Sequence, residues 1–152
     1  MVKYLEYGDI FNLEGISCYA HGCNCAGAMG KGIALQFKER YPKMYLEYKR
    51  LCKEGKFSLG EVFIYENGNS EFVFNLGTQK SWRVKADLNA IKTALENMLL
   101  FASKNNIEQI ALPKIGAGLG GLNWIDVKDI IDKVAFQYPN IDLYVIENYK
   151  KT

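Results

Sequence analysis

Apolar positions along the chain follow two periods, one typical of strands and one typical of helices. Short apolar runs that predict strands cover residues 3–7, 16–20, 61–65, 71–76, 109–112 and 143–146. Between the third and fourth of these runs stands the turn-prone sequence Asn67-Gly68-Asn69. This pair of strands is therefore predicted to form a hairpin, which makes the expected sheet a mixed one.

Helical spacing separates most of the predicted strands. Residues 86–103 carry apolar side chains on one stripe and predict the clearest helix. Helical spacing also begins at Ile33 and resumes after Pro42, and Asn123 is placed to cap a last helix with Asp126 near its positive end. The alternation of strands and helices predicts an α/β domain with helices on both faces of the sheet.

Composition narrows the class of protein. A length of 152 residues fits one domain, residues 1–152, and 49% hydrophobic content excludes disorder as the main state. The formal charge of +2 gives no broad cationic field, which argues against non-specific wrapping of nucleic acid. No window approaches the roughly 18 apolar residues of a membrane span, and the N-terminus lacks the apolar core of a signal peptide. The four cysteines show no framework spacing, so we expect reduced thiols in a cytoplasmic protein.

Two glycine-rich segments, residues 25–34 and 115–122, each lie between a predicted strand and a predicted helix. Glycine lets backbone N–H groups approach a ligand closely, and a helix N-terminus beside such a loop favours an anion. Either segment alone could be only a tight turn, whereas the two together at one sheet edge could hold two phosphates or one diphosphate. Neither contains a Walker motif, and the Gly-x-Gly-x-x-Gly string at residues 116–121 comes too late in the chain for a dinucleotide-binding βαβ unit.

Polar side chains near these segments supply candidate chemistry. Asp9 follows the first strand, where its carboxylate could accept a hydrogen bond from an adenine amino group or could simply form a turn. Asn24, at the lip of the first glycine segment, could bond a ribose hydroxyl. His21 lies close to Cys23 and Cys25, but the Cys-x-x-Cys spacing and the fourth ligand of a structural zinc site are missing, so no metal is expected.

A third polar segment, residues 78–83, follows the strand predicted to end at Leu76. It contains Lys80, and a lysine is usually a solvated surface residue. The alternative is that Lys80 acts as a nucleophile or as a phosphate partner. Trp82 and Arg83 could then shape or clamp the mouth of such a site.

Three strings together resemble the macrodomain family, whose members bind ADP-ribose. They are Gly27-Ala28-Met29-Gly30-Lys31-Gly32-Ile33-Ala34-Leu35-Gln36-Phe37-Lys38, Thr78-Gln79-Lys80-Ser81-Trp82-Arg83, and Leu112-Pro113-Lys114-Ile115-Gly116-Ala117-Gly118-Leu119-Gly120-Gly121-Leu122-Asn123-Trp124. The chain is similar in particular to the macrodomains that act as antitoxins against DNA ADP-ribosyltransferases and to the terminal ADP-ribose glycohydrolases. The resemblance implies a three-layer α/β/α fold with a central mixed, mostly parallel sheet.

The resemblance also implies roles for individual residues. Asp9 matches the acidic residue that reads adenine, Asn24 an asparagine at the distal ribose, and Lys80 the lysine that attacks the anomeric carbon. The candidate catalytic residues are Lys80, His21 and Asn24. The candidate ligand-binding residues are Asp9, Ile10, Asn24, Gly30, Gly32, Ile33, Ala34, Thr78, Gly116, Ala117, Gly118, Leu119 and Gly120. The resemblance calls for no cofactor and no metal.

Two departures from the family pattern keep three functions open. The terminal glycohydrolases have an aspartate near Gly120, whereas the antitoxin branch tolerates glycine there. The string from His21 to Cys25 is similar to the ADP-ribose-1''-phosphate phosphatases, in which a histidine could serve as general base. We therefore expect a hydrolase that removes ADP-ribosyl groups from DNA or protein, with a phosphatase and a non-catalytic reader as alternatives. We expect a monomer whose ligand is ADP-ribose or an ADP-ribosylated macromolecule. We expect no association with a membrane.

Overall fold

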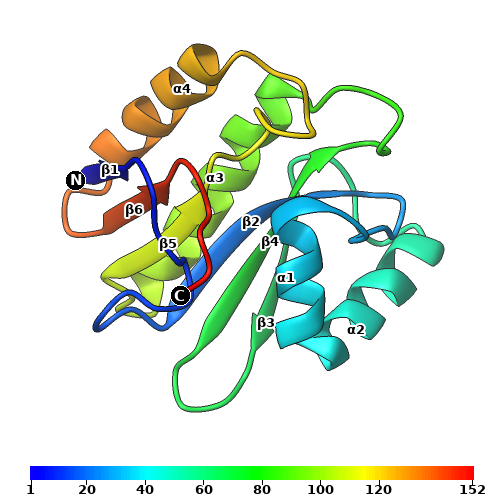
Figure 1. Ribbon diagram of the computed structural model, residues 1–152, viewed down its shortest axis with the longest axis horizontal. Coiled ribbons are helices and arrows are strands. Elements are labelled where there is room, and N and C mark those ends of the chain that lie inside the picture. The colour runs from blue at the N-terminus through cyan, green and yellow to red at the C-terminus, as the bar shows by residue number, and fades with distance from the viewer.

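The computed structural model describes residues 1–152 as six strands and four helices in one α/β arrangement (Figure 1). The elements in chain order are β1 (Val2–Leu5), β2 (Cys18–Asn24), α1 (Gly32–Arg40), α2 (Pro42–Lys53), β3 (Val62–Glu66), β4 (Phe72–Gln79), α3 (Leu88–Lys104), β5 (Gln109–Pro113), α4 (Trp124–Phe136) and β6 (Asp142–Ile146). The strands lie in the order β1-β6-β5-β2-β4-β3. Only β3 runs antiparallel to its neighbour, which confirms the predicted hairpin and the mixed, mostly parallel sheet.

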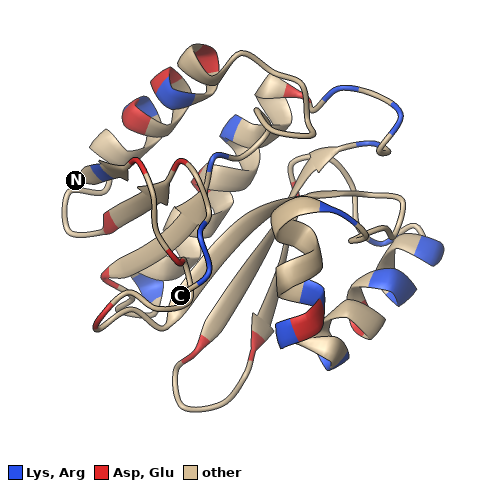
Figure 2. Ribbon diagram, viewed as in Figure 1, with Lys and Arg blue, Asp and Glu red and all other residues tan.

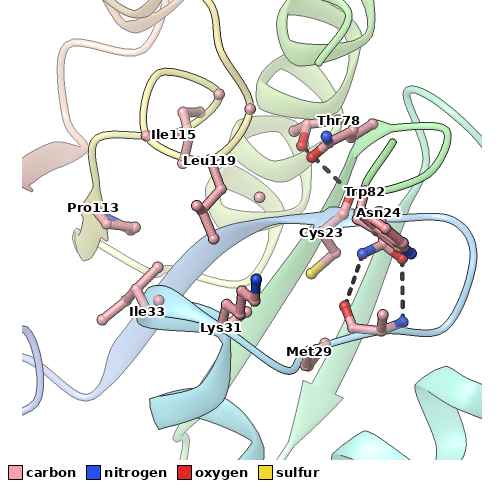
Figure 3. A pocket seen from close by; sticks show the side chains of 18 of the residues that line it. Cys23, Asn24, Met29, Lys31, Ile33, Thr78, Trp82, Pro113, Ile115 and Leu119 are labelled. Atoms are coloured by element: carbon pink, nitrogen blue, oxygen red, sulfur yellow. Dashed lines mark hydrogen bonds between the residues drawn. The ribbon is translucent and has the colours of Figure 1, made fainter. Parts of the chain in front are cut away.

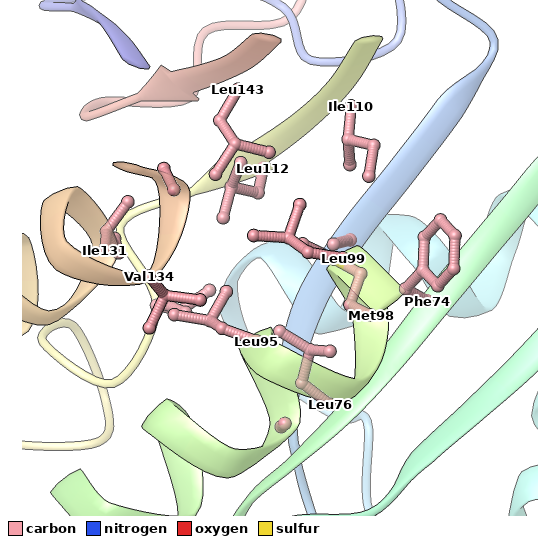
Figure 4. Close-up of a cluster of buried hydrophobic side chains, with 14 of the residues drawn as sticks. Phe74, Leu76, Leu95, Met98, Leu99, Ile110, Leu112, Ile131, Val134 and Leu143 are labelled. Atoms are coloured by element: carbon pink, nitrogen blue, oxygen red, sulfur yellow. The ribbon is translucent and has the colours of Figure 1, made fainter. Parts of the chain in front are cut away.

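The helices cover both faces of the sheet, as the alternation of elements predicted. Helices α3 and α4 pack on one face, where Leu95, Met98 and Ile131 meet strand residues in the larger core cluster (Figure 4). Helices α1 and α2 lie on the other face (Figure 1), where Phe37 and Met44 belong to a second cluster. Because both faces are covered, the central strands are almost entirely buried, as is usual for parallel sheets.

Local signals explain where several helices begin. The Asp87 side chain accepts the Ala90 N–H at 2.9 Å and caps α3, and Asn123 accepts the Ile125 N–H at 2.9 Å and caps α4 as predicted. Proline at the first position of α2 separates it from α1. No helix is both long enough and apolar enough to pass through a bilayer.

Two central strands extend further than their apolar runs indicated. Strand β2 continues through His21 to Asn24, and its partner β4 continues through Thr78 to Gln79. The polar residues are accommodated because they bond within the sheet: His21 pairs with Asn75, and the Thr78 hydroxyl donates to the Cys23 carbonyl. The strand predicted over residues 16–20 therefore begins two residues too early and ends four residues too early.

Candidate functional site

The two glycine segments meet at one edge of the sheet. Strands β2 and β5 are parallel neighbours, so their carboxyl ends lie side by side, and a glycine segment follows each of them. The Leu119 side chain of the second segment lies 3.4 Å from the position that a Cβ on Gly32 of the first segment would occupy. Between the segments lies a cavity of about 530 Å³ (Figure 3), within the range of small-molecule sites. The juxtaposition of the two segments that the sequence predicted is confirmed.

Backbone N–H groups without internal acceptors line this cavity from both sides. In the second segment, none of the N–H groups of residues 116–120 donates a hydrogen bond within the protein. In the first segment, α1 begins at Gly32, and its N-cap residue Lys31 offers no side-chain acceptor to the first turn. A row of free N–H groups opposite a free helix N-terminus is an anion-binding arrangement. The cavity can therefore hold a phosphate-bearing ligand at its centre.

Glycine is required at specific places in these segments. Gly32 and Gly116 have positive φ values of 61° and 71°, which residues that carry a Cβ rarely adopt. A Cβ on Gly120 would lie 2.6 Å from the Gly116 carbonyl oxygen, so no larger residue fits without a backbone shift. A Cβ on Gly30 or Gly118 would instead meet open space.

Asn24 organises the first glycine segment from within. Its Oδ1 accepts the N–H groups of Ala26 and Ala28 at 3.0 and 3.2 Å, and its Nδ2 donates to the Ala28 carbonyl at 2.8 Å; the Ala28 bonds are drawn in Figure 3. The buried Tyr48 hydroxyl of α2 donates to the Asn24 carbonyl at 2.7 Å and lies 3.0 Å from Oδ1. Asn24 thus lines the cavity with one amide hydrogen still available, and most of its capacity holds the loop.

His21 does not line the cavity. Its ring is fully buried, stacked on Phe37 at a centroid distance of 3.9 Å, and its Nε2 lies 2.7 Å from Asn75 Oδ1. Burial lowers the pKa of His21 to about 4, against which the bond to Asn75 acts only weakly. The imidazole is therefore neutral at physiological pH, and it lies behind the lining residue Cys23, whose Sγ is 3.4 Å from Nε2. It does not reach the cavity to provide the general base that the phosphatase alternative requires.

Lys80 and Thr78 lie at the opposite wall of the cavity, where β4 ends. Thr78 is buried and lines the cavity, as does Gln79. Lys80 is exposed and follows the lining residue Gln79 directly, but it is not itself a lining residue. Trp82 lines the cavity while remaining 66% exposed. This short segment therefore contributes one aromatic ring to the wall, and the amine of Lys80 lies between two lining residues in the sequence, Gln79 and Trp82.

Asp9 lies at a second hollow, separated from the cavity by α1. Its Oδ1 accepts the Phe11 N–H at 3.0 Å, and its Oδ2 accepts the N–H and hydroxyl of Thr152 at 3.0 and 3.2 Å. Burial acts to raise the pKa of Asp9, but these hydrogen bonds outweigh it and leave the pKa below its usual value. Gln36 and Arg40 of α1 face the same hollow. Ile10 beside Asp9 is a core residue that lines neither space.

Most of the predicted ligand-binding residues do lie together. The residues of the predicted set that line the cavity are Asn24, Gly30, Gly32, Ile33, Ala34, Thr78, Gly116, Gly118, Leu119 and Gly120. Asp9 and Ile10 lie outside it, and the Ala117 side chain does not contribute to its wall.

Sequence reasoning missed the cationic character of the wall. The twenty lining residues include Lys31 and Lys114 and no carboxylate. Lys31 had a visible signal, since it is the only charged residue inside the first glycine segment. Tyr48 had none, because its hydroxyl meets Asn24 only after α2 packs against the loop. No group of three or more His, Cys, Asp or Glu residues is placed to hold a metal ion.

Comparison with known proteins gives a consistent picture. A family model for the Macro domain matches residues 20–131. A DNA ADP-ribosyl glycohydrolase of Mycobacterium tuberculosis is 38% identical over 141 residues, which cover 91% of this chain but 40% of that protein. An ADP-ribose 1''-phosphate phosphatase of Debaryomyces hansenii is 27% identical over 182 residues, covering 97% of this chain and 100% of that protein. The solved macrodomain of Mycobacterium tuberculosis DarG superposes with a TM-score of 0.88 at 34% identity, covering 100% of this chain and 99% of that one.

Proposed function

The chain belongs to the Macro domain family, and on that premise we propose that it binds ADP-ribose and removes ADP-ribosyl groups from modified DNA. One observation carries the proposal: Gly116, Gly118, Leu119 and Gly120, whose N–H groups have no internal acceptor, line the same cavity as the start of α1. A diphosphate bridging those two sets of donors satisfies both at once.

The positions of the other polar groups orient the ligand. Asp9 lies beyond α1, so an adenine directed along that helix meets its carboxylate, which keeps acceptor capacity beside the bonds from Phe11 and Thr152. The distal ribose then lies toward the ends of β2 and β4, where Asn24 and Thr78 line the wall. The scissile bond comes to lie at the rim, near Lys80.

Lys80 is the group we place at the reacting carbon. Its Nζ forms a bond to the anomeric carbon of the distal ribose while the bond to the DNA breaks with its electron pair, and the proton released from Nζ neutralises the leaving group. Water then releases ADP-ribose and restores the amine. The N–H groups on the diphosphate fix the ribose at the rim, which supplies orientation. No carboxylate lines this cavity, so the route does not depend on an acid at Gly120.

DNA is the macromolecule that the relatives favour. Printed names of relatives from Mycobacterium tuberculosis and Thermus aquaticus, at 38% and 34% identity, describe DNA ADP-ribosyl glycohydrolases. The chain spans about two fifths of the length of each (40% and 35%), so their full activities pass to this chain only as a proposal.

The test measures binding and release separately. Calorimetry with ADP-ribose is expected to show one saturable site, and incubation with an ADP-ribosylated oligonucleotide is expected to release ADP-ribose. Lys80→Ala should keep the binding and lose the release, because Lys80 is at the rim and not in the wall. Release that survives in Lys80→Ala rejects the role of Lys80, and absence of ADP-ribose binding rejects the proposed function itself.

The phosphatase alternative has one observation in its favour, the full-length similarity to the Debaryomyces hansenii protein. Buried His21 speaks against it. Phosphate release from ADP-ribose 1''-phosphate, measured on the same preparation, compares the two reactions directly. Binding without product from either substrate identifies a reader instead.

A further inference from the structure

Cationic and aromatic side chains gather at the mouth of the cavity, on the segment between β4 and α3. Residues 80–85 are nearly all exposed, and they contain Trp82, Arg83 and Lys85. The side chain of Leu119, itself 71% exposed, shares the cavity mouth with Trp82, which is 66% exposed. Single exposed apolar residues need no explanation, but two at the mouth of a site form a surface for a ligand.

This segment is held against the second glycine loop. The Ala86 N–H donates to the Gly120 carbonyl at 2.9 Å, and the Lys85 side chain lies 3.4 Å from the position that a Cβ on Gly121 would take. The cations of residues 80–85 are therefore placed at the rim by the fold.

The charges at this rim are unpaired. None of Lys80, Arg83 and Lys85 takes part in a salt bridge, and neither do the lining residues Lys31 and Lys114. The neighbouring carboxylate, Asp87, is engaged in capping α3. Figure 2 shows the cations on the loop between β4 and α3, whereas acidic residues are mixed with basic ones on α4. The cations around this opening therefore have no carboxylate partner within the protein.

We propose that residues 81–85 bind the single-stranded DNA that flanks the ADP-ribosylated nucleotide, with Trp82 stacking on a neighbouring base and Arg83 and Lys85 contacting phosphates. The Arg83 guanidinium lies 5.0 Å from the centre of the Trp82 ring, so one face of the indole already carries a cation and the other can take a base. An aromatic platform beside cations that follow the backbone is how proteins bind single strands with little sequence preference. Unstacked bases are needed for such contacts, so a single strand fits this surface better than a duplex.

This inference rests on the proposed function for its substrate, but the surface can be tested without turnover. Fluorescence anisotropy of a labelled, unmodified single-stranded oligonucleotide should show salt-dependent binding to the wild type. Trp82→Ala should weaken that binding and also lower kcat/KM on an ADP-ribosylated oligonucleotide by roughly 5- to 150-fold, the range that one stacked base contributes. Arg83→Ala should reduce the slope of log affinity against log salt by about 1 and leave the affinity for free ADP-ribose unchanged.

Matched controls lie at the opposite sheet edge, where α3 and α4 end. Phe136→Ala removes an aromatic that is 87% exposed, and Lys104→Ala removes a cation at the end of α3. Neither change should alter oligonucleotide binding. Equal loss of oligonucleotide binding in Phe136→Ala and Trp82→Ala overturns the proposal.

Two further outcomes separate the inference from the proposed function. If Trp82→Ala weakens the binding of free ADP-ribose as much as it weakens the binding of the modified oligonucleotide, Trp82 contacts the ADP-ribose itself and the inference fails. Wild-type protein that binds the oligonucleotide through Trp82 but releases no ADP-ribose supports the surface and rejects the hydrolase. Hydrolysis of the modified oligonucleotide with no loss in Trp82→Ala or Arg83→Ala supports the hydrolase and rejects the surface.

Discussion

The hydroxyl of Tyr48 should govern the shape of the first glycine segment, and Tyr48→Phe tests this with the removal of a single oxygen atom. Burial raises the pKa of Tyr48, so the hydroxyl keeps its proton and acts as a donor. It donates to the Asn24 carbonyl at 2.7 Å and lies 3.0 Å from Oδ1, the same oxygen that holds the N–H groups of Ala26 and Ala28. A buried donor and the loop's central side chain are thus linked directly.

The magnitude follows from the burial of these groups. Loss of one buried hydrogen bond, with an acceptor left underused, costs about 1–3 kcal/mol. Suppose that about 1–2 kcal/mol of this cost disorders the loop rather than the whole protein. The fraction of molecules with a binding-competent loop would then fall, and the apparent Kd for ADP-ribose would rise by up to about 5- to 30-fold. We therefore expect Tyr48→Phe to lower the free energy of unfolding by about 1–2 kcal/mol and to weaken ADP-ribose binding.

Two assays and one control decide the matter. Urea unfolding gives the free energy of unfolding, and calorimetry gives the Kd for ADP-ribose. Tyr45→Phe is the matched control, because Tyr45 lies on the same helix and donates to the Gly27 carbonyl over a longer distance of 3.4 Å, at a half-buried position. Its effect should be well below that of Tyr48→Phe.

A double-mutant cycle makes the test stricter. Asn24→Ala removes the acceptor side of the network, so adding Tyr48→Phe should then have little further effect, and the coupling should be about 0.5–3 kcal/mol. Fully additive effects, or a Tyr48→Phe protein with unchanged stability and unchanged Kd, would refute the reasoning.

Two further predictions concern the loops and the buried histidine. Gly120→Ala should destabilise the protein by about 1–3 kcal/mol and weaken ADP-ribose binding, because its Cβ would lie 2.6 Å from the Gly116 carbonyl oxygen. The comparison is urea unfolding of Gly118→Ala, where the added Cβ meets open space. Equal stability of the two variants would contradict the structure. Since the pKa of His21 falls from 6.5 to about 4 on folding, the unfolded chain binds a proton first as pH falls, and stability should drop by about 2 kcal/mol between pH of about 7 and about 5. In His21→Gln this drop should be much smaller when urea unfolding is repeated at both pH values, and an identical pH dependence would show that His21 is not the group responsible.

The fold could be predicted from periodicity because burial repeats along each element. Apolar stripes located α3 and α4 to within a few residues, and Asn67 to Asn69 located the hairpin. The errors fall where polar side chains enter buried strands: β2 runs on through His21 to Asn24 because β4 supplies hydrogen-bond partners across the ladder. A linear pattern carries no information about a partner that is far away in the chain.

Local patterns in the sequence were enough to predict the elements and the two glycine segments that follow β2 and β5. Which side chains reach the site depends on how the elements pack. The stacking of His21 on Phe37 withdraws it from the cavity, and the packing of α2 brings Tyr48 to Asn24. The reason is that backbone position follows from local pattern, whereas the direction and the hydrogen-bond partners of a side chain depend on residues that only the folded chain brings together.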